Sequence, residues 1–297
     1  MPRDDPNGDQ TPIDYQICSY AGSRLSFRGP AVALERPFVA VLGGAETFGK
    51  YVPAPYAALL AEWIDLPVAN FGVAQAGLSL FSEEPWLLDA CSRAEVTVIQ
   101  VLGAQNMSNR LYSVHSRRND RFLSVSPALR DMFPDVDFSG INFTGHLLAT
   151  LATQSRASFQ VLVDELKWAW VQRMRRVLDL IQGDIILLWM SERCPDRGGN
   201  RHDQEEPHYV DRQMLNAVAD KVAGIVEVVA ERNQPKLDGM IFGEGEADAA
   251  MRLPGPFAHL QAAEKLAIAL SEVRGAAGQQ MRGPAPGSKL FNQFGHG

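Results

Sequence analysis

The sequence predicts an α/β fold, specifically a flavodoxin-like three-layer α/β/α sandwich with a parallel sheet and a helical insertion at 105–160. Two observations support this prediction. Short, continuous apolar runs alternate along the chain with longer segments of helical periodicity, and several of these runs end in glycine. Continuous apolar runs are typical of strands covered on both faces, and strands that alternate with helices build a parallel sheet between two helical layers.

Five segments are expected to form the strands of this sheet. In chain order they are 38–42, 66–71, 96–102, 184–190 and 225–229. The run Asp-Ile-Ile-Leu-Leu-Trp-Met at 184–190 has the strongest strand signal. Connections between parallel strands are right-handed, and ligands of such sheets bind beyond the carboxyl ends of the strands. A functional site is therefore expected in the loops that follow the strands.

Helical periodicity predicts the elements between the strands. Pro53 and Pro55 are expected to open a helix, because proline is tolerated in a first helical turn. Its apolar face would consist of Tyr56, Leu59, Leu60 and Trp63. A long helix is expected at about 158–182, and its apolar stripe places Trp170 and Met174 in the core. Further helices are expected from about 207 and at 259–273.

Length and composition favour one globular domain at 13–274, between a disordered N-terminal tail at 1–12 and a flexible C-terminal tail at 275–297. The net charge of −7 disfavours non-specific nucleic-acid binding. No apolar run reaches the roughly 18 residues of a membrane span, and the first residues are too polar for a secretion signal. A cytoplasmic protein with reduced cysteines is expected, and its oligomeric state is left open.

The loop after the first expected strand permits two interpretations. Gly44 to Lys50 has the GxxxxGK spacing of a phosphate-binding loop. That motif also needs Ser or Thr after the lysine to hold magnesium, but Tyr51 stands there. Prolines at 53 and 55 would also interrupt the helix whose amides should face the phosphate. A phosphate- or nucleotide-dependent transferase is therefore the less favoured interpretation.

The second interpretation rests on four segments in a fixed order. They are Leu42–Gly49 after the first strand, Asn70–Gly77 after the second, Gly103–Asn106 after the third and Phe257–Ala267 at the last helix. Together they resemble the sequence blocks of the SGNH (GDSL) hydrolase family. That resemblance implies an SGNH-type sandwich and a hydrolase or acyltransferase ancestry. It implies a catalytic serine at the position of Ala45, oxyanion donors from Gly77 and from Gln105 or Asn106, and a base at His259.

This sequence departs from the family pattern at two positions. Ala45 has only a methyl group where the nucleophile would stand, and a methyl group cannot attack a carbonyl. Pro256 occupies the position of the acid that would orient His259. An acid from the adjacent loop could replace it, namely Glu244, Glu246 or Asp248. The hydroxyl residues near the blocks, Thr47, Ser79 and Ser108, are expected to be cap or turn residues rather than nucleophiles.

An arginine-rich segment follows the third expected strand. Together with Glu46, the residues expected to contact a substrate are Asn109, His115, Arg117, Arg118 and Arg121. Guanidinium groups suit carboxylate, phosphate or sulfate, so this segment predicts a small anionic substrate or ligand. A solvated, ion-paired surface is an equally weighted interpretation. Glu46 lies near a helix start, where its negative charge is also expected to interact favourably with the helix dipole.

The polar stretch at 191–209 is expected to form a charged lid over the ligand edge. Its histidines, His202 and His208, lie among acids, but their spacing matches no metal-ligand pattern. No metal and no cofactor are predicted. His146 is expected in a core or at a helix start.

The sequence thus predicts an SGNH-like esterase or acyltransferase that acts on a small anionic acyl or acetyl ester and is inactive or impaired as Ala45. The alternative is a degenerate, non-catalytic protein of the same fold that binds an anionic ligand or a partner. Fold-level resemblance does not choose between them, because function depends on the groups in the site.

Overall fold

The computed structural model describes residues 12–197, 206–230 and 236–280, with side chains described as far as residue 276. Its centre is a five-stranded, all-parallel sheet with strand order β4-β3-β5-β8-β9. These strands are β3 (Val39–Gly43), β4 (Val68–Gly72), β5 (Val96–Gln100), β8 (Asp184–Ser191) and β9 (Gly224–Val229). This order is that of flavodoxin-like sheets, in which the direction of strand addition reverses between the first and third strands, although all strands stay parallel. The predicted fold class is confirmed.

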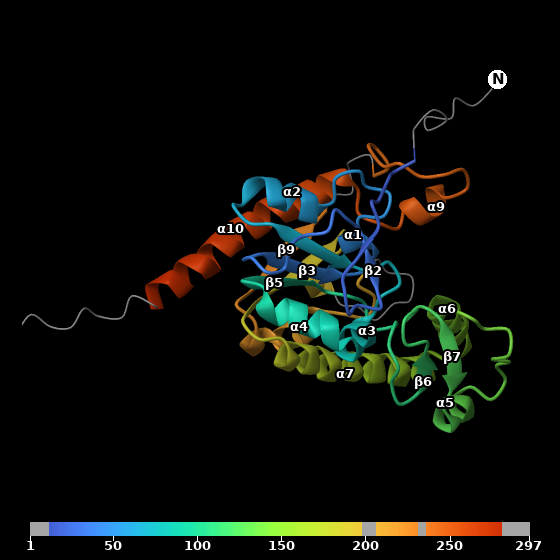
Figure 1. The fold of residues 1–297 in the computed structure, drawn as a ribbon. Coiled ribbons are helices and arrows are strands. Elements are labelled where there is room, and N and C mark those ends of the chain that lie inside the picture. Colours follow the sequence, from blue (N-terminus) through green and yellow to red (C-terminus); the bar gives the residue numbers. More distant parts are fainter. Residues whose placement is uncertain (1–11, 198–205, 231–235, 281–297) are drawn as a thin grey trace, which may run out of the picture.

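Two helical layers cover the sheet, because its strands are apolar on both faces. On one side lie α2 (Tyr56–Trp63) and α10 (Pro256–Gln280), packed against Val39 and Val41. On the other side lie α3 (Leu78–Glu83), α4 (Pro85–Arg93) and α7 (Arg156–Leu180), packed against Ala40 and Leu42 (Figure 1). Neighbouring residues of one strand therefore belong to opposite cores, as the pleat of a strand requires.

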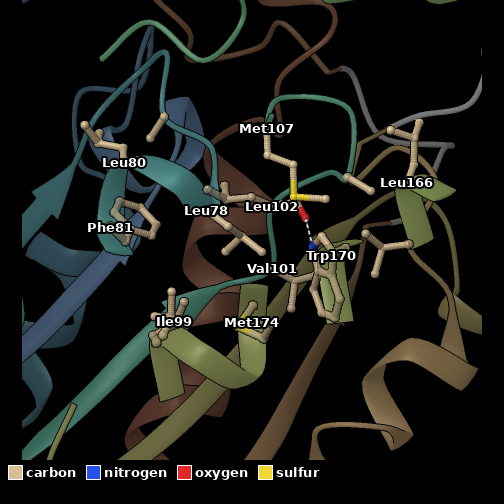
Figure 2. Packing of buried hydrophobic residues seen from close by; sticks show 14 of the residues in the cluster. Leu78, Leu80, Phe81, Ile99, Val101, Leu102, Met107, Leu166, Trp170 and Met174 are labelled. Atoms are coloured by element: carbon tan, nitrogen blue, oxygen red, sulfur yellow. Dashed lines mark hydrogen bonds between the residues drawn. The ribbon is translucent and has the colours of Figure 1, made fainter. Parts of the chain in front are cut away.

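The long helix contributes one of the two fully buried tryptophans of the second core. Trp170 and Met174 on α7 are fully buried, as predicted. Figure 2 shows them beside Ile99, Val101 and Leu102, with the indole Nε1 donating to the carbonyl of Leu102 at 2.8 Å. A buried indole N–H needs such a partner. This bond fixes the chain just beyond β5, where the loop toward the functional edge begins.

The insertion after β5 contains helices, as predicted, but it begins with an antiparallel hairpin. Its strands are β6 (Tyr112–Val114) and β7 (Phe122–Val125), and its helices are α5 (Pro127–Met132) and α6 (Thr144–Gln154). In Figure 1 this unit (green) stands at one end of the sandwich. Strands of three and four residues are too short to show a clear alternation in the sequence.

Short elements complete the described chain: β1 (Cys18–Ser19), β2 (Ser26–Phe27), α1 (Ala45–Phe48), α8 (Arg212–Asn216), α9 (Ala247–Ala250) and the 3₁₀ turns at Pro195–Arg197 and Ala219–Lys221. All three cysteines are free thiols. No helix in the described ranges combines the length and apolar character needed to cross a membrane.

Several boundaries differ from the sequence expectations. The predicted apolar face of α2 is correct for Tyr56 and Leu60, but Trp63 in the last turn is 43% exposed. The helix expected from about 207 is the single-turn α8, and α10 continues to Gln280, beyond the expected start of the C-terminal tail. The tail residues 1–11 and 281–297 lie outside the described part.

At the open edge of the sheet, Nζ of Lys265 on α10 donates to the carbonyl of Glu227 in β9 at 2.7 Å.

Candidate functional site

A cleft of about 2030 Å³ opens at the carboxyl edge of the sheet. Its floor is formed by the residues that follow β3 and β5, among them Ala45, Glu46 and Gln105. Its walls come from 206–208 and from the segment that runs from 236 into the first turn of α10. The sheet therefore presents a site where parallel α/β folds bind ligands.

The turn after β3 is shaped by close contacts that only glycine permits. A β-carbon on Gly43 would lie 1.9 Å from Oγ1 of Thr47 and 2.3 Å from Oε1 of Gln100. Gly49 ends the short helix α1 with a positive φ of 75°. The chain therefore turns sharply enough to direct Ala45 and Glu46 toward the cleft.

Gln100, the last residue of β5, holds this turn with its side-chain amide. Its Oε1 accepts from the N–H of Gly44 at 2.9 Å and from Oγ1 of Thr47 at 2.7 Å. Its Nε2 donates to Oε2 of Glu46 at 2.8 Å. Because the three contacts assign acceptor and donor ends unambiguously, the amide has one orientation only.

Glu46 is a carboxyl group taken almost completely out of water, with 7% of the residue exposed. Burial raises the pKa of Glu46, and the like charge of Glu206 raises it further. A carboxyl group in this environment holds its proton more firmly than an ordinary glutamic acid. Because Glu46 also lines the cleft, it has the properties of a proton donor.

Glu206 forms a second carboxyl centre on the opposite wall. Its Oε1 accepts from Nε2 of Gln105 at 2.6 Å, and its Oε2 accepts from the N–H of His208 at 2.9 Å. The imidazole Nε2 of His208 lies 3.6 Å from Oε1. A β-carbon on Gly103 would lie 2.6 Å from Oε2 of Glu206, so a larger residue there would require this carboxylate to shift.

Acidic groups outnumber basic groups along the cleft. The described lining contains Glu46, Asp120, Glu192, Glu206, Asp238 and Asp248, against Lys50, Lys236 and Arg252. Two of these groups neutralise each other, since Lys236 forms an ion pair with Glu192. This acidic lining does not support the predicted anionic ligand, which stays a prediction.

No serine, threonine or cysteine is among the described residues that line the cleft. Ala45 lies there, at the position that the family resemblance gives to the nucleophile. The hydroxyl groups weighed as substitutes are engaged elsewhere. Thr47 is fully buried against Gln100 and Tyr56, Ser79 accepts from Arg173, and Ser108 accepts from the N–H of Val114.

The structure does not bring His259 or Gly77 to the cleft, so it does not support the roles that the resemblance implies for them. His259 is 1% exposed on the core side of α10, where Nδ1 accepts from the N–H of Tyr56 at 3.1 Å. Burial lowers the pKa of His259 to about 3, which makes it a poor base at neutral pH. The N–H of Gly77 donates to Oδ1 of Asn119 at 2.7 Å and is not free for an oxyanion.

The acids considered as partners of His259 lie elsewhere. Glu246 accepts from the hydroxyl of Tyr51 at 2.8 Å, which lowers the pKa of Glu246. Asp248 lines the cleft, and Glu244 is exposed. None of the three hydrogen-bonds His259 in the described structure.

Of the insertion residues predicted to contact a substrate, none lines the cleft. Asn109 accepts from the backbone at 111 and 112, and Nδ1 of His115 accepts from the N–H groups of 117 and 118. Arg117, Arg118 and Arg121 are exposed on the turn between β6 and β7. The guanidinium of Arg118 lies 3.8 Å from Asp120, which is a lining residue. Asn106 does line the cleft, with Oδ1 accepting from Thr144.

The geometry also removes the basis of the phosphate-loop interpretation. The N–H groups of Gly44 and Thr47 both face Oε1 of Gln100 and are not available to a phosphate. Lys50 lies 3.8 Å from Glu246 and over the ring of Tyr51. Among the described residues, no group of three or more His, Cys, Asp or Glu side chains is arranged to hold a metal ion.

Sequence reasoning missed the two residues that organise the site, Gln100 and Glu206. Gln100 had a usable signal, since it is a polar residue inside an otherwise apolar strand. Glu206 lies in the polar stretch at 191–209, where the sequence gives several acids and no means of choosing among them. Of this expected lid, 206–208 line the cleft, whereas 198–205, including His202, lie outside the described residues. His146 is exposed in the first turn of α6.

Comparison with solved structures gives distant similarities only. A lipase from a goat rumen metagenome is 11% identical, with a TM-score of 0.39 over 79% of this chain and 97% of that one. An acetylxylan esterase from Geobacillus stearothermophilus, solved as a catalytic mutant, is 12% identical, with a TM-score of 0.37 over 80% and 94%. A protein from Lactobacillus plantarum is 16% identical, with a TM-score of 0.34 over 80% and 97%. Similarity at this level says nothing about a shared site or substrate.

No curated protein sequence matches the chain significantly. One family model does match, over residues 4–274, and so includes every residue of the cleft. That family is described as a domain of unknown function, DUF6473. The chain, with its carboxyl-lined cleft at the edge of a flavodoxin-like sheet, therefore belongs to the DUF6473 family.

Proposed function

We propose that this protein is a hydrolase that cleaves an ester with water as the nucleophile, with Glu46 as the proton donor and Glu206 as the base. One observation supports this most directly. Two carboxyl groups in different environments line one cleft, and no serine, threonine or cysteine stands with them in the described lining. Paired carboxyl groups whose environments differ are a recurrent way to divide acid and base roles.

The proposed roles follow from the contacts of each group. Glu206 is held by Gln105 and by the N–H of His208, and its side chain is 38% exposed, so a water molecule can reach it. Glu46 is buried, and Gln100 contacts only one of its oxygens in the described hydrogen bonds, so the other can carry a proton. Proton transfer by such positioned groups accelerates reactions by about 10²- to 10⁴-fold.

The reaction balances without a covalent intermediate. Glu206 takes a proton from water while the water oxygen attacks the ester carbonyl carbon. The tetrahedral adduct then collapses, the bond to the alkoxy oxygen breaks, and Glu46 gives its proton to that oxygen. The products are a carboxylic acid and an alcohol, and a proton passed from Glu206 back to Glu46 restores the starting state.

The leaving group provides the test of these two roles. Ethyl butyrate has a poor leaving group that needs a proton, whereas p-nitrophenyl butyrate has a good one that does not. Glu46→Gln should lower kcat about 100-fold on the ethyl ester and much less on the p-nitrophenyl ester. Glu206→Gln should lower kcat on both esters, because both need an activated water.

Glu244→Gln serves as the matched control, since Glu244 is an exposed carboxylate outside the cleft lining. It should leave both rates unchanged. Equal losses on the two esters in Glu46→Gln would contradict the donor role. No turnover of any ester by the native chain would contradict the hydrolase proposal and favour the non-catalytic alternative.

A further inference from the structure

Three large apolar side chains are exposed on the wall of the cleft that runs from 236 into α10, where Asp238 and Asp248 also lie. Met251 follows α9, and Phe257 and Leu260 lie in the first turn of α10. Their exposed fractions are 47%, 42% and 36%, and all three line the cleft. We call these three residues the apolar rim.

The local structure explains why these side chains face outward together. Phe257 and Leu260 are three residues apart, so they share one face of α10. The adjoining face of α10 packs in the core, because Ala258 and His259 are only 3% and 1% exposed. The outward direction of the rim is therefore a property of the helix register and not of loose packing.

Other apolar side chains line the same cleft as the apolar rim. Leu59 on α2, Pro53 and Leu253 also line it. Glu46 lines the floor and Glu206 the opposite wall, so one cleft of about 2030 Å³ holds both carboxyl groups and this apolar surface. Contiguous exposed apolar surface beside polar groups is typical of a ligand-binding groove.

We infer that the apolar rim binds the acyl chain of the substrate, and that this chain is an alkyl group of medium length rather than an acetyl group. This inference rests on the proposed function, because it takes the reacting ester to lie between Glu46 and Glu206. The occupant is assigned from the continuity of the cleft: an acyl chain whose carbonyl lies between Glu46 and Glu206 extends toward the apolar rim in the same cleft. A small acyl group would leave the rim in contact with water.

The rim should make turnover depend on chain length. Each methylene removed from water contributes enough free energy to raise kcat/KM about fourfold. In a series of p-nitrophenyl esters from acetate to decanoate, kcat/KM of the native chain should rise over several steps before it levels off. Phe257→Ser and Leu260→Ser should flatten this series.

Ile268→Ser is the matched control. Ile268 lies on the same helix with 61% exposure, but it does not line the cleft. This variant should retain the native chain-length dependence. A flattened series in Ile268→Ser would show that the loss comes from the helix as a whole and would overturn the assignment to the rim.

A binding measurement separates this inference from the proposed function. Octanamide and butanamide carry acyl chains but no ester, so calorimetric titration with them requires no catalysis. The native chain should bind octanamide more tightly than butanamide, and Phe257→Ser should remove the difference. That result would support the rim even if no ester were hydrolysed, whereas equal binding of the two amides would overturn it.

Light scattering tests the competing occupant, a second copy of this chain. The apparent mass should be the same for the native chain and for Phe257→Ser. A native dimer that becomes a monomer in Phe257→Ser would show that the rim is covered by another copy, and the acyl-chain assignment would fall.

Discussion

Gln100 Nε2 lies 2.8 Å from Oε2 of Glu46, so the last residue of β5 holds the buried carboxyl group that follows β3. The two strands are neighbours in the sheet, and this contact joins their carboxyl ends. The same amide accepts from Gly44 and Thr47. One side chain therefore fixes both the shape of the turn and the position of its acid.

Gln100→Leu should lower the free energy of unfolding by roughly 1–3 kcal/mol, because it leaves buried donors at Gly44 and Thr47 without acceptors. Urea denaturation at neutral pH measures this change. Gln154→Leu, at an exposed position on α6, should have little effect. Equal stability of the native chain and Gln100→Leu would show that the amide does not support the turn.

Glu46→Gln should become more stable relative to the native chain as the pH rises. The pKa of Glu46 is raised in the folded protein, so folding favours the protonated form. The stability gained in this way is fully present below the ordinary glutamate pKa of about 4.3 and is lost as the pH rises through the folded pKa. Glutamine cannot ionise and escapes this loss. Denaturation of both proteins from about pH 4 to pH 8 measures the difference in their free energies of unfolding. Free energies that change in parallel with pH would contradict the prediction.

His259→Gln should retain the kcat of the native chain, because the imidazole lies in the core and not in the cleft. It should also reduce the acid sensitivity of the fold. The folded pKa of about 3 lies below the ordinary value of 6.5, so stability from the neutral ring is lost as the pH falls from about 6.5 toward 3. Unfolding curves across that range and rates on p-nitrophenyl butyrate are the two measurements. A large loss of kcat in a folded His259→Gln variant would support the role of His259 as the catalytic base.

Ala45→Ser should not create a covalent esterase. A serine there would enter the cleft without His259 as its base, and the N–H of Gly77 is already engaged by Asn119. Mass spectrometry after incubation with p-nitrophenyl acetate should detect no acetylated protein. An acetyl adduct on the new serine would show that another group in the cleft can activate it.

Arg28→Met should lower the free energy of unfolding by about 2–4 kcal/mol. The buried guanidinium donates to four carbonyls in the segment 48–53, including Gly49 at 2.7 Å and Pro53 at 2.6 Å. Methionine fills the space but donates to none of these carbonyls, and within the described chain only that of Gly49 keeps a second donor, the N–H of Val52. Arg36→Met is the control, because Arg36 is exposed. Similar stabilities of the two variants would contradict the role given to Arg28.

The sheet was predictable because each of its strands is a local pattern. Leu42 and Trp189 belong to apolar runs whose continuity shows that both faces are covered. The edge at which the site forms follows from the same patterns, since Ala45, Gln105 and Asn106 come directly after predicted strands. Hydrophobic periodicity is local information, and it therefore specifies this part of the fold.

The composition of the site was not predictable to the same degree. The contact between Glu206 and Gln105 joins positions 101 residues apart, and no sequence spacing specifies it. His259 shows the converse problem, because a histidine beside a short motif does not reveal which face of its helix is buried. The hairpin β6–β7 was missed because a strand of three residues has almost no periodicity to detect.

The lysine at the margin of the sheet has a consequence for how these molecules behave in a concentrated solution. β9 is one of the two edge strands of the sheet, and its main chain could accept a strand from a neighbouring molecule. Any such strand would have to displace the ammonium group of Lys265 from the carbonyl of Glu227 and leave that charge without its acceptor. Each copy therefore discourages the addition of a strand from another molecule at the β9 edge of its sheet.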